Sequence, residues 1–420
     1  MIVSRRSLLS AAALAPALPT LAAASGQMAE PAGAPALPAR ADFAPMPFTY
    51  LDSGSTHPTP LAPQATMADY LRYKGRAADA PSFDMDEREK AVMADFAKLV
   101  GCDADELCFI QSTTMGEALV IQALDLPRAG GRIVTDALHF FGSFYTYGEL
   151  GKAGMDVVTL PMTKEGRIDM AAMGAAVNGK TRLVSISAVS TTNGFQHDLK
   201  KVCDLAHAHG AYIYADIVHG AGTVPIDLHA AGVDFAAASS YKWLMGDFGL
   251  GFLYVRKDLL DKIRRPWWGY HQVASFKPHV FPYDPPGSSV ADCDASPDAT
   301  GHFGMGTTSW SGVILLGHSL PWLNKVGIGA IQAWRQPMVD AVQGELRRRG
   351  YEPLTPADQR TPLVAFALKD ARAKLGDKMK EAKIRLTISQ NRFRVSISVF
   401  NDMNDIDRLL AALPKTPPPG

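Results

Sequence analysis

The sequence has no excess of charge of either sign. Lys plus Arg and Asp plus Glu both number 42 among its 420 residues, so the formal net charge is zero. A chain without a net field has no overall attraction for nucleic acid or for an anionic membrane surface. We therefore expect the protein to bind a small molecule and not a nucleic acid.

Cysteine is also scarce, with four residues in the whole chain: Cys102, Cys108, Cys203 and Cys293. They are too few and too scattered for a disulfide framework, and none forms the C-x-x-C pair that is typical of zinc sites. We expect most of them to be small buried apolar residues, and we predict no metal site.

Long apolar runs are missing after the N-terminus, so no later stretch could cross a bilayer. At the N-terminus, Ser4-Arg5-Arg6-Ser7 precedes an Ala- and Leu-rich run that ends in Ala22-Ala23-Ala24-Ser25. This pattern is typical of a twin-arginine export signal with a small-residue cleavage site. The alternative is an uncleaved anchor, but Pro16 and Pro19 interrupt a run that is short for a membrane span.

We therefore predict a signal peptide over residues 1–25, followed by a flexible leader rich in Ala and Pro over residues 26–47. The mature protein is then expected in the periplasm, without a stable membrane span. Twin-arginine export carries folded cargo, so a cofactor made in the cytoplasm could be bound before export.

Apolar runs of strand length alternate with helix-like segments between residues 90 and 255, which indicates a wound α/β sheet. Helices are predicted at 116–123, 169–177 and 199–208. Seven strands are predicted, at 107–111, 132–135, 156–160, 183–188, 212–216, 235–239 and 251–255. In such sheets ligands gather at the carboxyl ends of the strands, so chemistry is expected just after each strand.

The composition changes between residues 266 and 306, which are rich in Pro, Gly, Asp and aromatic residues and show no clear hydrophobic period. A loop of this length is typically functional or packs on a partner, and its aromatic cluster at 265–271 would border a pocket or an interface. Further helices and strands are predicted at 313–323, 328–348, 363–368, 393–399 and 402–413. We therefore predict a large domain over 48–310 and a smaller α+β domain over 311–413.

A lysine follows the sixth predicted strand, in Ser239-Ser240-Tyr241-Lys242-Trp243. This position lies at the active edge of the sheet, among small hydroxyl residues. A partly desolvated amine beside a cationic group has a depressed pKa and can condense with an aldehyde. Taken alone, a lysine after a strand is more often a solvated strand end, because lysine is rarely buried.

Asp216 ends the apolar run Tyr212-Ile213-Tyr214-Ala215, which should bury its carboxylate at a strand end. A buried carboxylate is costly unless it is paired. A protonated pyridine nitrogen would be such a partner, and the ion pair would keep that ring cationic and able to accept electrons. An Asp that caps the next helix is the equal alternative.

Thr113 and Thr114 stand between the strand at 107–111 and the helix predicted from residue 116. Two hydroxyls and free backbone amides at a helix N-terminus form a seat for phosphate. Ser112 or Thr113 could equally be an ordinary N-cap. His139 follows the strand at 132–135 and could lie flat on a cofactor ring, although a lone His is more often a surface residue.

Seven short motifs stand in the order that one family of enzymes shows, at Tyr50-Leu51-Asp52-Ser53-Gly54, Ser112-Thr113-Thr114, Asp136-Ala137-Leu138-His139, Val189-Ser190-Thr191, Ala215-Asp216-Ile217-Val218-His219, Ser239-Ser240-Tyr241-Lys242 and Phe393-Arg394-Val395-Ser396. In these motifs the chain resembles the class V aminotransferases, and within them the isopenicillin-N-epimerase-like branch, neighbours of the cysteine desulfurases. The resemblance covers about residues 50–410. It implies that the cofactor is pyridoxal 5′-phosphate. It also implies an α/β fold, fold type I of the enzymes that use this cofactor, with a large domain around a seven-stranded, mostly parallel sheet and a smaller α+β domain.

By position, the resemblance implies that Lys242 bonds to the cofactor's aldehyde, that Asp216 contacts the pyridinium and that His139 stacks on the ring. His219 takes the place where desulfurases use Gln near the phenolic oxygen. The residues that would hold the phosphate are Thr113, Thr114, Ser239 and Tyr241.

The resemblance also implies that Arg394 grips a substrate α-carboxylate with its planar fork, beside Thr191. Gly306-Thr307 matches the segment that reaches the neighbouring subunit's phosphate, which predicts a homodimer. The chain departs from the family in three places. It has no cysteine after Cys293 for a desulfurase loop, Thr191 stands where Asn is usual, and Phe303-Gly304-Met305 replaces the Glu that usually precedes Gly-Thr.

Together these features predict an aminotransferase-type enzyme that acts on an amino acid or amine, with Lys242 as the general base for the α-proton. Epimerisation and C–S or β-elimination use the same lysine and aspartate, so they stay open. An exported enzyme would tailor a periplasmic metabolite or peptide. A cofactor-binding protein without turnover is the alternative from another class, but it should lack Lys242 or Asp216.

Overall fold

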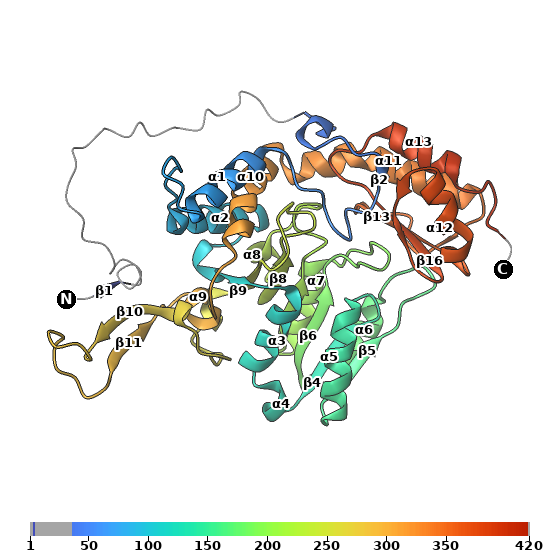
Figure 1. Ribbon diagram of the computed structural model, residues 1–420. Helices are drawn as coiled ribbons and strands as arrows, with labels where there is room; N and C mark the ends of the chain where they lie inside the picture. Colours follow the sequence, from blue (N-terminus) through green and yellow to red (C-terminus); the bar gives the residue numbers. More distant parts are fainter. Residues whose placement is uncertain (1–2, 5–35, 419–420) are drawn as a thin grey trace.

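The computed structural model describes residues 3–4 and 36–418, and its centre is a seven-stranded sheet (Figure 1). The strand order is β3-β9-β8-β7-β6-β4-β5, with β9 antiparallel to both neighbours and the other adjacent strands parallel. The strands are β3 (Leu107–Ile110), β4 (Arg132–Asp136), β5 (Asp156–Leu160), β6 (Thr181–Ser187), β7 (Tyr212–Asp216), β8 (Phe235–Ser239) and β9 (Gly251–Val255). The predicted strands and the mostly parallel sheet are confirmed.

Helices cover both faces of this sheet because its central strands are apolar on both sides. Along β8, Ala236 and Ala238 belong to one hydrophobic cluster, and Phe235 and Ala237 belong to the other. A strand between two helical layers requires such a run without polar alternation. The helices around the sheet are α2 (Met85–Val100), α3 (Thr113–Ala123), α4 (Leu126–Ala129), α5 (Phe141–Lys152), α6 (Met170–Ala176), α7 (Leu199–Ala208) and α8 (Leu228–Ala231).

The helix predicted at 116–123 is present as α3, but it begins earlier, at Thr113. Ser112 is its N-cap, since the Ser112 hydroxyl accepts the amide of Met115 at 3.2 Å. The alternative that Ser112 is an ordinary N-cap is therefore confirmed. The start was misplaced because the apolar period becomes visible only one turn after the cap.

The C-terminal part is built on a second, antiparallel sheet with the order β12-β13-β16-β15. Its strands are β12 (Glu352–Pro353), β13 (Leu363–Ala367), β15 (Thr387–Ile388) and β16 (Arg392–Ser396), and its helices are α11 (Ile328–Arg348), α12 (Ala371–Glu381) and α13 (Met403–Ala412). β14 (Ile384–Arg385) pairs with β2 (Thr49–Tyr50) near the N-terminus. This part lies at one end of the molecule in Figure 1.

Helix α10 (Trp310–Val326) joins the two parts and packs on α1 (Ala62–Lys74) and α2. Its Val313 and Leu316 belong to a hydrophobic cluster of the large sheet. The domain limits 48–310 and 311–413 stay predictions. Within residues 3–4 and 36–418, no helix has both the length and the apolarity that a bilayer crossing needs.

The segment 266–306 is more regular than its composition predicts. It forms a hairpin of β10 (Val273–Pro278) and β11 (Ala291–Ala295), followed by α9 (Ala299–Phe303), and Figure 1 shows the hairpin projecting from the body. Most hairpin residues are exposed or half-buried, so the sequence lacks the apolar alternation that would have revealed the strands.

The N-terminal segment falls partly outside the described residues. The predicted signal peptide, residues 1–25, lies outside them except for β1 (Val3–Ser4), which pairs with β10. The flexible leader predicted over 26–47 is corrected for residues 36–47, where Ala39 and Phe43 are buried. The amide of Ala39 donates to the carbonyl of Val399 at 2.8 Å, because the C-terminal part supplies a partner that composition cannot reveal.

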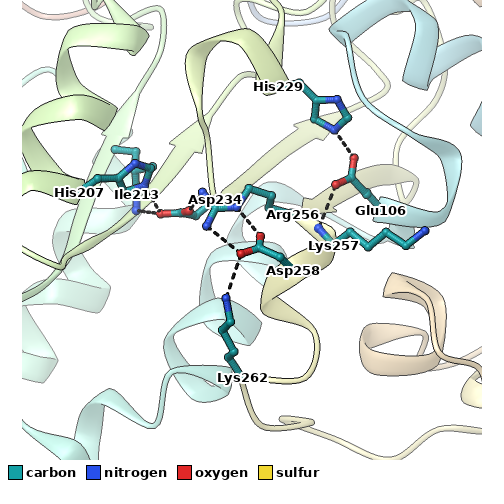
Figure 2. A network of polar contacts seen from close by, with 9 residues as sticks. All are labelled: Glu106, His207, Ile213, His229, Asp234, Arg256, Lys257, Asp258 and Lys262. Carbon is teal, nitrogen blue, oxygen red and sulfur yellow. Dashed lines mark hydrogen bonds and ion pairs between the residues drawn. The ribbon is translucent and has the colours of Figure 1, made fainter.

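A polar network fixes the edge of the sheet opposite the carboxyl ends of the parallel strands (Figure 2). Asp234, directly before β8, is fully buried and accepts hydrogen bonds from His207 and from the amide of Ile213, both at 2.9 Å. It also pairs with Arg256, directly after β9, at 2.6 Å. Glu106, directly before β3, accepts the amide of Lys257 at 2.9 Å. These contacts connect four strand ends on this side of the sheet. The predicted site residues lie on the opposite side, at the carboxyl ends of the parallel strands.

Candidate active site

Three of the predicted side chains meet at the carboxyl edge of the sheet. Asp216 is the last residue of β7, while Lys242 and His139 lie in the turns after β8 and β4. Their exposed fractions are 3% for Asp216, 7% for Lys242 and 1% for His139. The alternatives of a solvated lysine and a surface histidine are therefore wrong.

The surroundings of Lys242 favour its neutral amine. Burial lowers the pKa of the ammonium to about 8, with Arg394 acting in the same direction and the Asp216 carboxylate opposing both. With such a pKa, about a tenth of the amine is neutral at pH 7, against far less for an ordinary lysine. The position therefore suits a nucleophile that condenses with an aldehyde.

Asp216 is a buried carboxylate without a helix to cap. Its Oδ1 accepts the amide of Val218 at 2.9 Å, and the next helix, α8, is capped by Asp227 instead. Burial raises the pKa of Asp216, while His139, the Val218 amide and Lys242 act to lower it. The helix-cap alternative is wrong, and the carboxylate is free to face a cationic ring.

His139 is held by a buried polar cluster that the sequence did not reveal. Its Nε2 lies 3.0 Å from Oε1 of Glu117, and its Nδ1 lies 2.9 Å from the hydroxyl of Ser187. Glu117 also accepts hydrogen bonds from Ser143 at 2.6 Å and from Tyr147 at 2.5 Å. The available signal was a glutamate in the otherwise apolar stretch of α3, since a buried carboxylate needs donors.

The charges of this pair depend on one another. Burial alone would lower the pKa of His139, but the charge and hydrogen bond of Glu117 together raise it. Burial would likewise raise the pKa of Glu117, but the charge and hydrogen bonds of His139, Ser143 and Tyr147 bring it below its usual range. Each partner therefore stabilises the charged form of the other.

The predicted phosphate seat is the N-terminus of α3, beside the end of β8. The amide of Thr113 donates to the hydroxyl of Ser239 at 3.3 Å, which brings two of the predicted residues together. Thr114 is exposed in the first turn of the helix, and Ser239 is buried. Tyr241 is half-buried, and its ring stacks on Phe248 with the ring centroids 4.5 Å apart.

His219 lies between Lys242 and Trp243. Its Nε2 is 3.1 Å from Nζ of Lys242, and its Nδ1 accepts the indole N–H of Trp243 at 3.1 Å. Burial lowers the pKa of His219 well below its usual value, and the positive charges of Lys242 and Arg394 add to this effect. The ring is therefore a neutral imidazole.

Arg394, on β16, enters the site from the C-terminal part and is 3% exposed. Its Nη1 donates to the carbonyl and the hydroxyl of Thr191 at 2.8 and 2.9 Å, and Asp52 lies 3.8 Å from its Nη2. Burial lowers the pKa of the guanidinium to about 10. Within the described residues its buried Nε has no hydrogen-bond partner.

Thr307 does not join this group. It is exposed, and its hydroxyl lies 2.9 Å from the hydroxyl of Tyr270. The role predicted for Thr307 concerns a neighbouring subunit's phosphate, so its position outside this chain's site is compatible with that prediction.

The four cysteines have no place in the site geometry. Cys108 and Cys203 are buried, Cys102 is half-buried, and Cys293 lies exposed on β11. Burial raises the pKa of the Cys102, Cys108 and Cys203 thiols, so none of these three is a ready thiolate.

One group of potential metal ligands occurs among the described residues, at the far edge of the sheet. Ligand atoms of Asp103, Glu106 and His229 lie within 4.8 Å of one another. Asp103 and Glu106 form a capping box at the short helix over 104–106, and Glu106 also binds His229. The cluster is accounted for as a helix cap and an ion pair.

The residues at the carboxyl edge fit pyridoxal 5′-phosphate. Lys242 offers a buried amine to the aldehyde, Asp216 a buried carboxylate to the pyridine nitrogen, and the N-terminus of α3 a seat for the phosphate. His139 and His219 supply fixed imidazoles beside these groups.

Two sequence comparisons relate the chain to known proteins. The model of the family described as aminotransferase class-V matches residues 49–409. The chain is 25% identical over 389 residues to a cysteine desulfurase of Klebsiella pneumoniae, covering 87% of this chain and 93% of that protein.

Solved structures share the fold. The cysteine desulfurase CsdA from Escherichia coli superposes with a TM-score of 0.75 at 22% identity, covering 89% of this chain and 97% of that one. A cystine C-S lyase, C-DES, in complex with its product cysteine persulfide superposes with a TM-score of 0.74 at 19% identity, covering 87% and 97%. The predicted fold is therefore confirmed.

Proposed function

Since the chain belongs to the aminotransferase class-V family and has pyridoxal 5′-phosphate as its cofactor, we propose that it is a lyase that breaks a C–S bond of an amino acid by β-elimination. The observation that carries this proposal is a combination of two features. Lys242 and Arg394 are both buried, and the sequence has no cysteine beyond residue 293. Lys242 and Arg394 supply what elimination needs, while sulfur transfer to an enzyme thiol on a C-terminal loop lacks its nucleophile.

When bound, the cofactor withdraws electrons from the substrate's α-carbon and so stabilises negative charge there. Asp216 keeps the proton on the pyridine nitrogen through its buried charge. Arg394 holds the α-carboxylate with its buried guanidinium and thereby orients the α-proton. Lys242, whose pKa is lowered to about 8, removes that proton as a general base.

Loss of the α-proton sets up departure of a thiol or persulfide from the β-carbon. The C–H electron pair forms the α,β double bond, and the C–S electron pair leaves with sulfur. The remaining enamine hydrolyses to an α-keto acid and ammonia, so the bond change needs neither an oxidant nor a second amino acid.

Two kinds of similar protein support a substrate with sulfur on its β-carbon. The Klebsiella pneumoniae relative is described as a cysteine desulfurase, and C-DES is described as a cystine C-S lyase. A lyase releases its sulfur with the leaving group, which suits a chain whose only exposed cysteine, Cys293, sits on the projecting hairpin.

The experiment is a product assay on the holoenzyme with L-cystine and L-cysteine as probes. Elimination yields pyruvate, ammonia and a sulfur product in equal amounts, with cysteine persulfide formed from L-cystine and hydrogen sulfide from L-cysteine. A transaminase would instead form the intact sulfur-containing keto acid only when an amino acceptor is added, and an epimerase would form the D-amino acid with no release of sulfur.

Two variants make the assay specific. Lys242→Ala should abolish both product formation and the visible absorbance of the bound cofactor, whereas Cys293→Ser should release pyruvate at the wild-type rate. Pyruvate release that stops in Cys293→Ser, or the formation of inverted or transaminated product alone, contradicts the proposal.

We also propose that the protein acts in the periplasm on a metabolite or peptide. The sequence Ser4-Arg5-Arg6-Ser7 before the Ala-rich run supports this location. Replacing Arg5 and Arg6 together by lysine keeps the charge but removes the twin-arginine pattern, so the protein should stay in the cytoplasmic fraction. Equal periplasmic amounts of both forms would contradict export by this route.

A homodimer is proposed as the working form. Trp267, Trp268 and Tyr270 are exposed by 53%, 80% and 61%, and Tyr270 contacts Thr307. Exposed aromatic residues in one segment are typical of interfaces. Light scattering should give twice the monomer mass for the wild type, and Trp268→Glu should shift it toward the monomer; a wild-type monomer would contradict this form.

A further inference from the structure

Trp243 is the residue directly after Lys242, yet its indole acts on a different side chain. It is 4% exposed, and its N–H donates to Nδ1 of His219 at 3.1 Å. The other ring nitrogen of His219, Nε2, lies 3.1 Å from Nζ of Lys242. Trp243, His219 and Lys242 therefore form one line of contacts that ends at the reactive amine.

The indole fixes where the proton of His219 lies. An indole N–H can only donate, so Nδ1 of His219 must accept and cannot carry a hydrogen. His219 is neutral because it is 1% exposed and lies beside Lys242 and within the field of Arg394. A neutral imidazole whose Nδ1 is bare carries its proton on Nε2.

We propose that Trp243 is a positioning residue that locks His219 in the Nε2–H tautomer, so that His219 presents a hydrogen-bond donor, and never an acceptor, to the nitrogen of Lys242. A donor facing Nζ is compatible with the neutral amine, which has a lone pair to accept it. The ammonium has three donors and no acceptor, so it would face another donor. The lock therefore favours the form of Lys242 that reacts with an aldehyde.

Other groups also face Lys242, and they remain in place when Trp243 is changed. Asp216 from β7 favours the ammonium, as does the Tyr241 ring, whose centroid is 5.6 Å from Nζ. Arg394 from β16 and burial favour the neutral amine. Asp216 is in turn faced by His139 and Glu117. These groups are the same in the wild type and in a Trp243 variant, so the replacement changes only the tautomer of His219.

This role belongs to the cofactor site on which the proposed function rests, and it is independent of which bond the enzyme breaks. In Trp243→Phe, Nδ1 of His219 loses its donor, and the ring is free to carry its proton there. Nε2 then becomes an acceptor for the ammonium of Lys242. The charged form gains a partner, so the pKa of Lys242 should rise.

The measurement is the rate at which the apoprotein captures pyridoxal 5′-phosphate, followed by visible absorbance across a range of pH. Capture by the wild type should reach half its limiting rate near the Lys242 pKa of about 8. In Trp243→Phe the midpoint should move up by about one pH unit, so capture near neutral pH is about tenfold slower. The limiting rate at high pH should stay close to that of the wild type.

Matched variants separate the lock from a general loss of packing. Trp322→Phe also removes an indole hydrogen bond, the one at 3.2 Å to Asp42, and should leave the midpoint unchanged. In a His219→Leu background, where the side chain has neither a donor nor an acceptor, adding Trp243→Phe should shift nothing further. A midpoint in Trp243→Phe that coincides with the wild type overturns the inference.

A direct readout needs no variant and therefore survives any folding defect. Nitrogen NMR of the apoprotein labelled at histidine distinguishes a protonated from a bare ring nitrogen. His219 should show a bare Nδ1 and a protonated Nε2 at neutral pH. A proton on Nδ1 overturns the lock even if the product assay supports the lyase, whereas a failed product assay leaves the lock intact.

Discussion

Glu117 holds His139 through a hydrogen bond of 3.0 Å between Oε1 and Nε2, and both side chains are buried. The Glu117 carboxylate also accepts hydrogen bonds from the hydroxyls of Ser143, Tyr147 and Ser185. Its negative charge strengthens each of these hydrogen bonds. The histidine that is predicted to stack on the cofactor ring is thus held by a buried glutamate of α3.

Glu117→Gln should destabilise the protein and weaken cofactor binding. The amide keeps the volume of the side chain but loses the charge and turns one acceptor into a donor. Charge-assisted hydrogen bonds contribute about 1.5–3 kcal/mol, so the free energy of unfolding should fall by about 2 kcal/mol. Urea unfolding and titration with pyridoxal 5′-phosphate measure both effects.

Glu149→Gln, on the exposed side of α5, is the control for that change. It should leave stability and cofactor affinity at the wild-type values. Wild-type affinity in Glu117→Gln would show that His139 keeps its position without the carboxylate.

Asp216→Asn should leave a protein that still captures the cofactor but turns over poorly. Removing one partner of a buried ion pair costs about 3–5 kcal/mol, which corresponds to a loss of about 100-fold or more. The pKa of Lys242 should also fall further, because Asp216 acts to raise it. Steady-state kinetics and the pH profile of capture check the two effects, and unchanged turnover would exclude Asp216 as the pyridinium partner.

Arg394→Gln should raise KM for amino acids more than it lowers kcat. The buried guanidinium supplies a charge-assisted hydrogen bond to the α-carboxylate, so its loss should raise KM by about 10- to 100-fold. The corresponding amine without a carboxylate should bind both forms equally. Arg385→Gln, exposed on β14, is the matched control; an equal effect in that variant would mean that Arg394 has no specific contact with substrate.

Acid should destabilise the protein through His57, which packs against Phe43 and Phe400. Burial lowers the pKa of His57 from 6.5 to about 4. Between these two values the unfolded chain binds the proton and the folded protein does not, so stability falls as pH falls through this window and is unaffected by His57 above it. One such group contributes a slope of at most about 1.4 kcal/mol per pH unit.

His57→Phe should therefore flatten the dependence of the unfolding free energy on pH inside that window, whatever it does to the absolute value. His209→Phe, at the exposed C-terminal end of α7, should leave the slope as it is. Identical slopes in His57→Phe and the wild type would place the acid transition elsewhere.

Local sequence patterns were enough to predict the central sheet and its chemical groups. The apolar runs that become β7 and β8 are short and bounded by turn residues. Asp216 is the last residue of β7, and Lys242 follows three residues after the end of β8. Local periodicity and covalent order suffice for such features, because strand direction places every carboxyl end on one edge. The order of the seven motifs also predicted the cofactor and the family.

The contacts between these groups could not be predicted before the chain was seen folded. Glu117 reaches His139, Trp243 reaches His219 and Arg394 reaches Thr191 across separations that no local pattern encodes. Ala39 likewise has its backbone partner, Val399, in a distant segment. Hydrogen bonds between buried polar groups depend on packing distances of a few ångströms, and those distances exist only once the sheet and its helices have closed.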